Sequence, residues 1–145
     1  MAIELANVLV DTQFNDLVAL ALAARSKAYA PYSKFAVGTA VKCKSGAVFV
    51  GANIENRSFG LTICAERVAM GTAVAAGERD FVAIAVTADS DEPIVPCGSC
   101  RQFLAEFAPD LIIVSATVRG QRQIENLSHL LPDPTRGILR HADPF

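Results

Sequence analysis

Two continuous apolar runs limit the folds that this chain can adopt. They are FVAIAVTA at residues 81–88 and LIIVSAT at residues 111–117. Each has the length of a strand and lacks polar alternation, which is typical of strands buried on both faces. The segment between them, CGSCRQFLAEFA at residues 97–108, is helical in pattern and ends before Pro109. This alternation predicts an α/β fold in which helices pack on a mixed sheet.

The N-terminal half predicts a helix, a hairpin and a second helix. Residues 12–28 carry apolar side chains at helical spacing. The Val- and Phe-rich runs 35–43 and 47–55 flank a turn that contains a glycine, which indicates a β-hairpin. Residues 64–77 are rich in alanine and finish on Gly77, a typical helix end.

The C-terminal part of the sequence is less regular. Residues 123–131, QIENLSHLL, predict a short helix, and a Pro-rich tail follows. The 145 residues show no long linker, low-complexity tract or internal repeat. We therefore expect a single domain over residues 1–145.

Composition excludes several classes of protein. Apolar residues make up 52% and charged residues 19% of the chain, which is unlike a disordered protein. A net charge of −2 offers no basic stripe for nucleic acid. No apolar run reaches the roughly 18 residues of a membrane span. The first residues carry acids and lack a secretory pattern, so we expect a cytoplasmic protein with reduced thiols.

Three of the four cysteines precede or begin helical runs. Cys97 and Cys100 are three positions apart, so both sulfurs can lie on one helical face. Such a pair also occurs in redox proteins, which need no third cysteine. Cys64 precedes another helical run. Three thiols at two helix N-termini could bind zinc tetrahedrally with one corner open, as catalytic zinc sites do.

The remaining candidates are weaker from the residues alone. Glu66 lies two positions after Cys64, and such positions diverge on a regular helix. A proton shuttle and an acid favoured by the helix dipole are equally compatible with it. Cys43 fits a small buried residue better than a ligand, and His129 and His141 fit packing or solvent-facing roles.

Five segments occur in the order found in one enzyme family. They are APYSKFAVGTAV, GANIEN, CAER, PCGSCRQ and NLSHLLP, and together they span about residues 12–132. In them the chain resembles the small homotetrameric zinc-dependent cytidine deaminases, of the cytidine and deoxycytidylate deaminase superfamily. The resemblance implies a three-layer α/β/α fold with a mixed five-stranded sheet. It also implies a homotetramer with sites at the subunit interfaces and one zinc ion per chain.

The same resemblance implies the reaction and its central residues. The family hydrolyses cytidine and 2′-deoxycytidine to the uridines with release of ammonia, in pyrimidine salvage. Carried onto this chain, zinc is held by Cys64, Cys97 and Cys100. Zinc-bound hydroxide attacks C4 of the base, and Glu66 is the proton shuttle.

Further roles follow from the same resemblance. Asn53 and Glu55 would hold the ribose 3′-hydroxyl, Phe35 would pack on the base or sugar, and the Ala65 amide would contact the carbonyl of the base. Three thiolates leave zinc with a net charge of −1, and an adjacent guanidinium that hydrogen-bonds the sulfurs would draw charge back. Arg67 resembles that group, and Arg101 follows Cys100 in a similar way.

Two positions depart from the family pattern. Phe59 stands where the family usually has Tyr, and Thr135 where it commonly has a Phe that stacks on the base in a neighbouring subunit. A different aromatic such as Phe145, or a modified cytosine nucleoside such as blasticidin S as the substrate, would accommodate the second departure. The rivals outside the family are a non-catalytic zinc-stabilised binding module and a redox dithiol protein.

Overall fold

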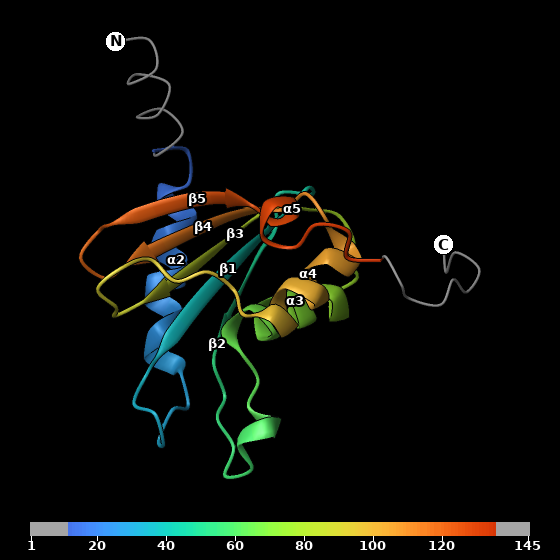
Figure 1. Cartoon of the computed structure of the whole chain (residues 1–145). Helices are drawn as coiled ribbons and strands as arrows, with labels where there is room; N and C mark the ends of the chain where they lie inside the picture. The colour runs from blue at the N-terminus through green and yellow to red at the C-terminus, as the bar shows by residue number, and fades with distance from the viewer. Residues whose placement is uncertain (1–11, 136–145) are drawn as a thin grey trace.

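A five-stranded mixed sheet forms the centre of the molecule (Figure 1). The computed structural model describes residues 12–135. The strands are β1 (Val37–Cys43), β2 (Val48–Ala52), β3 (Phe81–Ala88), β4 (Ile112–Thr117) and β5 (Arg122–Asn126). They lie in the order β2-β1-β3-β4-β5, and only the β3–β4 pair is parallel. The predicted α/β fold with a mixed five-stranded sheet is confirmed.

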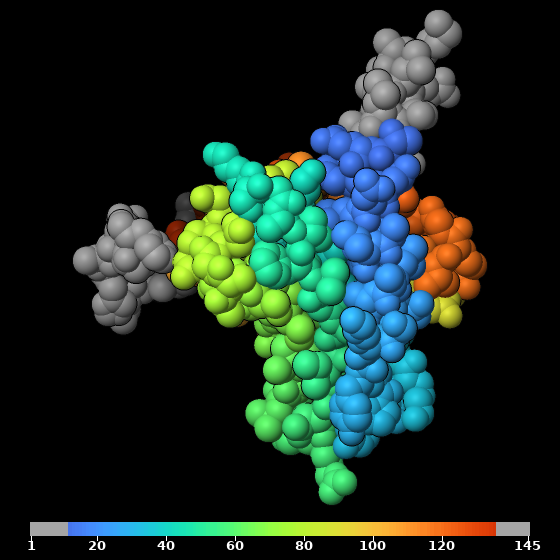
Figure 2. Space-filling view, turned by 180° about the vertical axis from the view of Figure 1, so that it is seen from behind, coloured from blue at the N-terminus to red at the C-terminus, as the bar shows by residue number. Residues whose placement is uncertain are grey.

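Helices cover both faces of this sheet, which gives the three predicted layers. The helices are α2 (Asn15–Ala24), α3 (Ala65–Ala75), α4 (Gly98–Phe107) and α5 (Leu127–Leu130), with short 3-10 turns η1 (Arg25–Lys27) and η2 (Phe59–Leu61). Helix α2 lies alone on one face among the described helices, and Figure 2 shows it in blue, running along the back of the molecule. Helices α3, α4 and α5 pack on the opposite face (Figure 1).

The central strands are buried on both sides, as their continuous apolar runs predict. In β3, Ala83 and Ala85 pack toward α2, whereas Ile84 between them packs toward α3 and α4. All three side chains are fully buried. This alternation along a strand is what a sheet covered by helices on both faces requires.

A glycine sets the distance between β2 and the N-terminal end of α3. A Cβ atom on Gly51 would lie 2.5 Å from the Ala69 nitrogen and 2.6 Å from the Ala65 carbonyl oxygen. The helix backbone therefore rests directly on the strand. At its other end α3 stops as predicted before Gly77, whose φ of +101° is accessible to glycine at little cost.

The predicted helix over residues 123–131 is only partly correct. Residues Arg122–Asn126 form β5, which pairs antiparallel with β4, and the helix is confined to Leu127–Leu130. The strand lies at the sheet edge and is only partly buried, so it lacks the continuous apolar run of β3 and β4. Pairing with β4, rather than a local pattern, makes this segment a strand.

Two residues named from the sequence, His141 and Phe145, lie outside the described residues. Within residues 12–135, no helix combines the length and the apolar character that crossing a membrane requires.

Candidate active site

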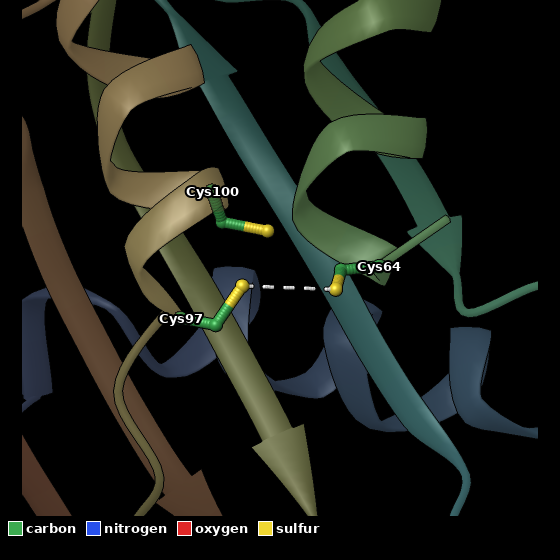
Figure 3. A group of neighbouring side chains, drawn as sticks. All are labelled: Cys64, Cys97 and Cys100. Carbon is green, nitrogen blue, oxygen red and sulfur yellow. Dashed lines mark hydrogen bonds between the residues drawn. The ribbon is translucent and has the colours of Figure 1, made fainter. Parts of the chain in front are cut away.

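The starts of α3 and α4 bring three cysteines together. Cys64 is the N-cap residue of α3, Cys97 is the N-cap residue of α4, and Cys100 lies in the first turn of α4. Their sulfur atoms all lie within 4.8 Å of one another, and the Cys64 and Cys97 sulfurs are 3.9 Å apart. Figure 3 shows the three side chains pointing toward a common centre. The two helix N-termini direct their positive ends at this cluster and favour negative charge there.

The spacing of the sulfurs suits a zinc ion. With Zn–S bonds of about 2.3 Å, two thiolates at corners of a tetrahedron are separated by ~3.8 Å. The 3.9 Å between Cys64 and Cys97 agrees with this value. Three sulfur ligands leave the fourth corner for water or substrate, which is the composition of a catalytic zinc site.

Cys64 and Cys100 divide the charge of the cluster unequally. A hydrogen bond from the Cys100 thiol, followed by one from Arg67, lowers the pKa of Cys64 to about 5 against the effect of burial. The same hydrogen bond with Cys64, together with burial, raises the pKa of Cys100. The cluster therefore favours a negative charge on the sulfur of Cys64, next to Arg67, even without a metal.

Arg67 lies against the cluster as its sequence position suggests. Its Nη2 donates to the Cys64 sulfur at 3.7 Å and to the Thr62 carbonyl at 3.2 Å. The hydrogen bond to Cys64 raises the pKa of Arg67, so the guanidinium remains charged. Its Nε is buried without a hydrogen-bond partner among the described residues. A permanent positive charge thus adjoins the sulfur that carries the negative one.

Glu66 is buried in the first turn of α3, with 5% of its surface exposed. Burial raises the pKa of this carboxyl to about 7, and the negative charge of Cys64 acts in the same direction. Glu66 in turn raises the pKa of Cys100, so the carboxyl lies within electrostatic reach of two thiols. A carboxyl with a pKa near neutrality can both accept and return a proton at physiological pH. Ala65, between Cys64 and Glu66, is fully buried.

Asn53 follows β2 and clamps the segment before β1. Its Oδ1 accepts a hydrogen bond from the Val37 amide, and its Nδ2 donates to the Phe35 carbonyl, both at 2.9 Å. One hydrogen of the Nδ2 group remains for another acceptor. Asn53 is buried, whereas the Phe35 ring is 38% exposed. The amide therefore fixes the backbone on both sides of Phe35 while the ring stays accessible.

Glu55 is hydrogen-bonded to the loop that precedes Phe35. Its Oε1 accepts hydrogen bonds from the amides of Tyr32 and Ser33, at 3.0 and 3.1 Å, respectively. A hydrogen bond with the side chain of Ser33 is the main cause of the lowered pKa of Glu55, so the carboxylate is ionised at neutral pH. Neither of these two backbone hydrogen bonds uses Oε2.

A short backbone pairing connects this loop to the cysteine cluster. Ile54 and Ile63 exchange two hydrogen bonds, each 2.9 Å long. Ile54 lies between Asn53 and Glu55, and Ile63 immediately precedes Cys64. The segments that carry the two groups of predicted site residues are therefore held side by side, as the lower part of Figure 1 shows.

The other candidates lie elsewhere. Cys43 is buried in the core formed with α3 and α4, and burial raises the pKa of its thiol, so its interpretation as a packing residue is confirmed. His129 is exposed in α5 and does not belong to the metal-binding group of the described residues. Arg101 does not hydrogen-bond the sulfurs. Its guanidinium instead donates to the carbonyls of Pro96 and Leu130, so the expected similarity to Arg67 is wrong.

Comparison with known proteins agrees with this geometry. The model of the cytidine and deoxycytidylate deaminase zinc-binding region matches residues 11–116. The chain belongs to this family. A curated cytidine deaminase of Halalkalibacterium halodurans is 50% identical over 117 residues, which cover 80% of this chain and 89% of that protein. The crystal structure of cytidine deaminase from Burkholderia pseudomallei has a TM-score of 0.79 at 48% identity, covering 81% of this chain and 95% of that one.

A relative named for a different activity is more distant. The blasticidin-S deaminase of Bacillus cereus is 32% identical over 108 residues, 69% of this chain and 76% of that protein. As a member of a zinc-binding deaminase family, the chain is a hydrolase that uses zinc, and the cluster at the helix starts is a group that can hold the ion.

Proposed function

We propose that this chain is a zinc-dependent deaminase of cytidine and 2′-deoxycytidine that acts in pyrimidine salvage. The observation that carries the proposal is the pairing of three clustered thiols with a buried carboxyl whose pKa is about 7. Identity of 50% to a cytidine deaminase over most of the chain supports the choice of substrate. We assign the metal to Cys64, Cys97 and Cys100. A zinc ion held there contributes the activation of water for nucleophilic attack.

Glu66 moves the proton in this proposal. It accepts one proton from the attacking water and delivers it to N3 of the cytosine ring, and it then transfers the proton of the new C4 hydroxyl to the departing amino group. The overall reaction adds one water at C4 and releases ammonia, so no electrons are transferred. Burial suits Glu66 to this work because its pKa lies near the operating pH, where transfer in both directions is fast.

The ribose and the base are assigned to the loop next to the cluster. Asn53 retains one Nδ2 hydrogen, and the Glu55 carboxylate has more acceptor sites than its hydrogen bonds to the 32–33 loop use, so the pair offers a donor and an acceptor. This combination suits a hydroxyl such as the ribose 3′-OH, which both donates and accepts. The exposed ring of Phe35 would pack on the nucleoside, and the Ala65 amide, in the first turn of α3, would donate to the carbonyl of the base.

We further propose a single-domain subunit that assembles into a homotetramer with sites at subunit interfaces. Support comes from large apolar side chains exposed near the site, namely Tyr29, Tyr32, Ile54, Phe59, Leu61 and Ile63. Exposed large apolar side chains of this kind are typical of protein interfaces. Phe59, at 75%, is the most exposed of them. We also propose that the protein acts in the cytoplasm, and its free cysteines support this because thiols stay reduced there.

A comparison of substrates tests the proposed activity. Ammonia release is measured with cytidine, 2′-deoxycytidine and blasticidin S at equal concentration. We expect turnover of both natural nucleosides and little of blasticidin S. Turnover of blasticidin S alone would support the second candidate, to which the exposed Thr135 and the Bacillus cereus relative point. Release of ammonia from none of the three would contradict the proposal.

A further inference from the structure

The side chain of Arg101 connects two segments that are far apart in the sequence. Arg101 follows Cys100 on α4, and its guanidinium is partly buried. Its Nε donates to the Pro96 carbonyl at 2.7 Å, and its Nη1 donates to the Leu130 carbonyl at 3.1 Å. One planar cation thus bridges the loop before α4 and the C-terminal end of α5.

The first of these hydrogen bonds acts on the peptide that precedes a metal ligand. The Pro96 carbonyl and the Cys97 nitrogen belong to the same planar peptide unit, so fixing the oxygen fixes the plane from which Cys97 departs. Among the described residues, no other hydrogen bond reaches the backbone of residues 93–96. Pro96 is buried but the Cys97 side chain is exposed, so packing alone constrains that sulfur little. The Arg101 side chain therefore fixes the peptide on the N-terminal side of Cys97, while the Arg101 amide holds the Cys97 carbonyl at 2.9 Å.

The second hydrogen bond acts on the segment that leaves α5. The last carbonyls of a helix have no partner within it, and Leu130 is the final residue of α5. The start of the same helix is anchored in the core, because Leu127 is fully buried and its amide donates to the Leu111 carbonyl. Next to Arg101, Gln102 donates to the Pro134 carbonyl at 3.2 Å. Two neighbouring side chains of α4 therefore hold residues 130–134.

We propose that Arg101 is a positioning residue that orients the metal ligand Cys97 and couples it to the C-terminal segment 130–134. The inference rests on the proposed assignment of Cys97 as a zinc ligand. The role requires arginine, because a guanidinium presents several N–H groups in a rigid fork, whereas the single ammonium of lysine sits on a flexible stem. A displacement of residues 130–134 then alters how firmly Cys97 holds the ion.

Zinc retention tests the first half of this proposal. In Arg101→Gln, the full chain is expected to bind one zinc at saturating metal but to hold it about 10- to 100-fold more weakly in competition with a chelator. Arg79→Gln is the matched control, since Arg79 also donates to two backbone carbonyls, those of Val74 and Glu78, at the other end of α3. It should hold zinc as the parent does. Equal zinc affinity in parent and Arg101→Gln would overturn the proposal.

Hydrogen exchange tests the coupling. Amide exchange in residues 127–134 should accelerate at least several-fold in Arg101→Gln and remain unchanged in Arg79→Gln. Arg101→Lys should give an intermediate zinc affinity and retain the faster exchange, because one ammonium cannot bridge both carbonyls in the same geometry. If Arg101→Lys matches the parent in both measurements, the bridge has no specific role. Unaltered exchange in Arg101→Gln despite weaker zinc binding would overturn the coupling.

These outcomes differ from failure of the proposed function. If the parent protein binds zinc yet releases no ammonia from cytidine, the function is wrong, but the effect of Arg101 on zinc retention can still be measured.

Discussion

The sulfur atoms of Cys64 and Cys97 lie 3.9 Å apart although the two residues are 33 positions apart in the sequence. Each cysteine is the N-cap residue of a helix, and the two helices pack side by side on one face of the sheet. Helix α3 leads the chain away from Cys64, and strand β3 returns it to the side of the sheet where α4 begins. The cluster is therefore a product of the α/β topology, and the helix N-termini that create it also favour its negative charge.

Removal of the Glu66 carboxylate should separate catalysis from metal binding. Glu66→Gln keeps the shape of the side chain but cannot carry a proton, so we expect turnover of cytidine to fall by about 10²- to 10⁴-fold with zinc content unchanged. Glu106→Gln, on the exposed side of α4, is the control and should keep full activity. Unchanged processing of ligand in Glu66→Gln would favour the non-catalytic binding module.

Metal-free protein should expose a reactive thiolate at Cys64. Because its pKa is about 5, Cys64 is ionised at pH 7, and its ionised fraction declines only as the pH falls through that value. We expect an alkylating reagent to modify Cys64 well before the buried thiols Cys43 and Cys100, whose pKa values are raised. Peptide mapping after brief alkylation measures this order.

Zinc provides the control for that experiment. One equivalent per chain should protect Cys64, Cys97 and Cys100 together. Protection of the Cys97–Cys100 pair alone, with Cys64 still reactive, would argue for a dithiol site instead of the three-cysteine cluster.

Loss of the Asn53 amide should weaken both the fold and substrate binding. Asn53→Ala removes the partners of the Phe35 carbonyl and the buried Val37 amide, so we expect about 1–3 kcal/mol less stability and a higher KM for cytidine. Asn53→Asp is the sharper variant. It can still accept from Val37 but cannot donate to Phe35, and its destabilisation should be measurable by urea unfolding. A variant with parental stability would show that the clamp contributes nothing.

Because β2 packs closely on α3, two glycine-to-alanine substitutions should change the stability of the protein in opposite directions. Gly51→Ala would force a methyl group to within 2.5 Å of the α3 backbone, so α3 must move and stability should fall by roughly 1–3 kcal/mol. Gly71→Ala, inside α3 with nothing within 4 Å of the added Cβ, should instead gain about 0.5–1 kcal/mol. Thermal unfolding of the two variants checks the opposite signs.

The sequence predicts the buried elements well and the edges poorly. The apolar runs of β3 and β4 indicate buried strands without any tertiary information, and the structure confirms them. The partly exposed strand β5 resembles a helix in sequence, because its strand character comes from pairing with β4. Local patterns do not contain that contact.

The same limit applies to the candidate site. The spacing of Cys97 and Cys100 indicates that both can bind one metal ion, and a resemblance to one family adds Cys64 as a ligand and Glu66 as the proton shuttle. The hydrogen bond from Arg101 to Leu130 joins residues 29 positions apart, and no short sequence motif predicts it. The sequence likewise suggests substrate-binding groups at Asn53 and Glu55, but not that both already bind the loop around Phe35.

Zinc-dependent release of ammonia is the direct test of the proposed function. The metal-free protein is titrated with zinc, and the conversion of cytidine is followed by its ultraviolet absorbance at each step. We expect no activity without metal, a linear rise in activity as zinc is added, and a plateau at one zinc per chain. Full activity in metal-free protein, or a zinc-loaded protein that leaves cytidine unchanged, would contradict the proposed function.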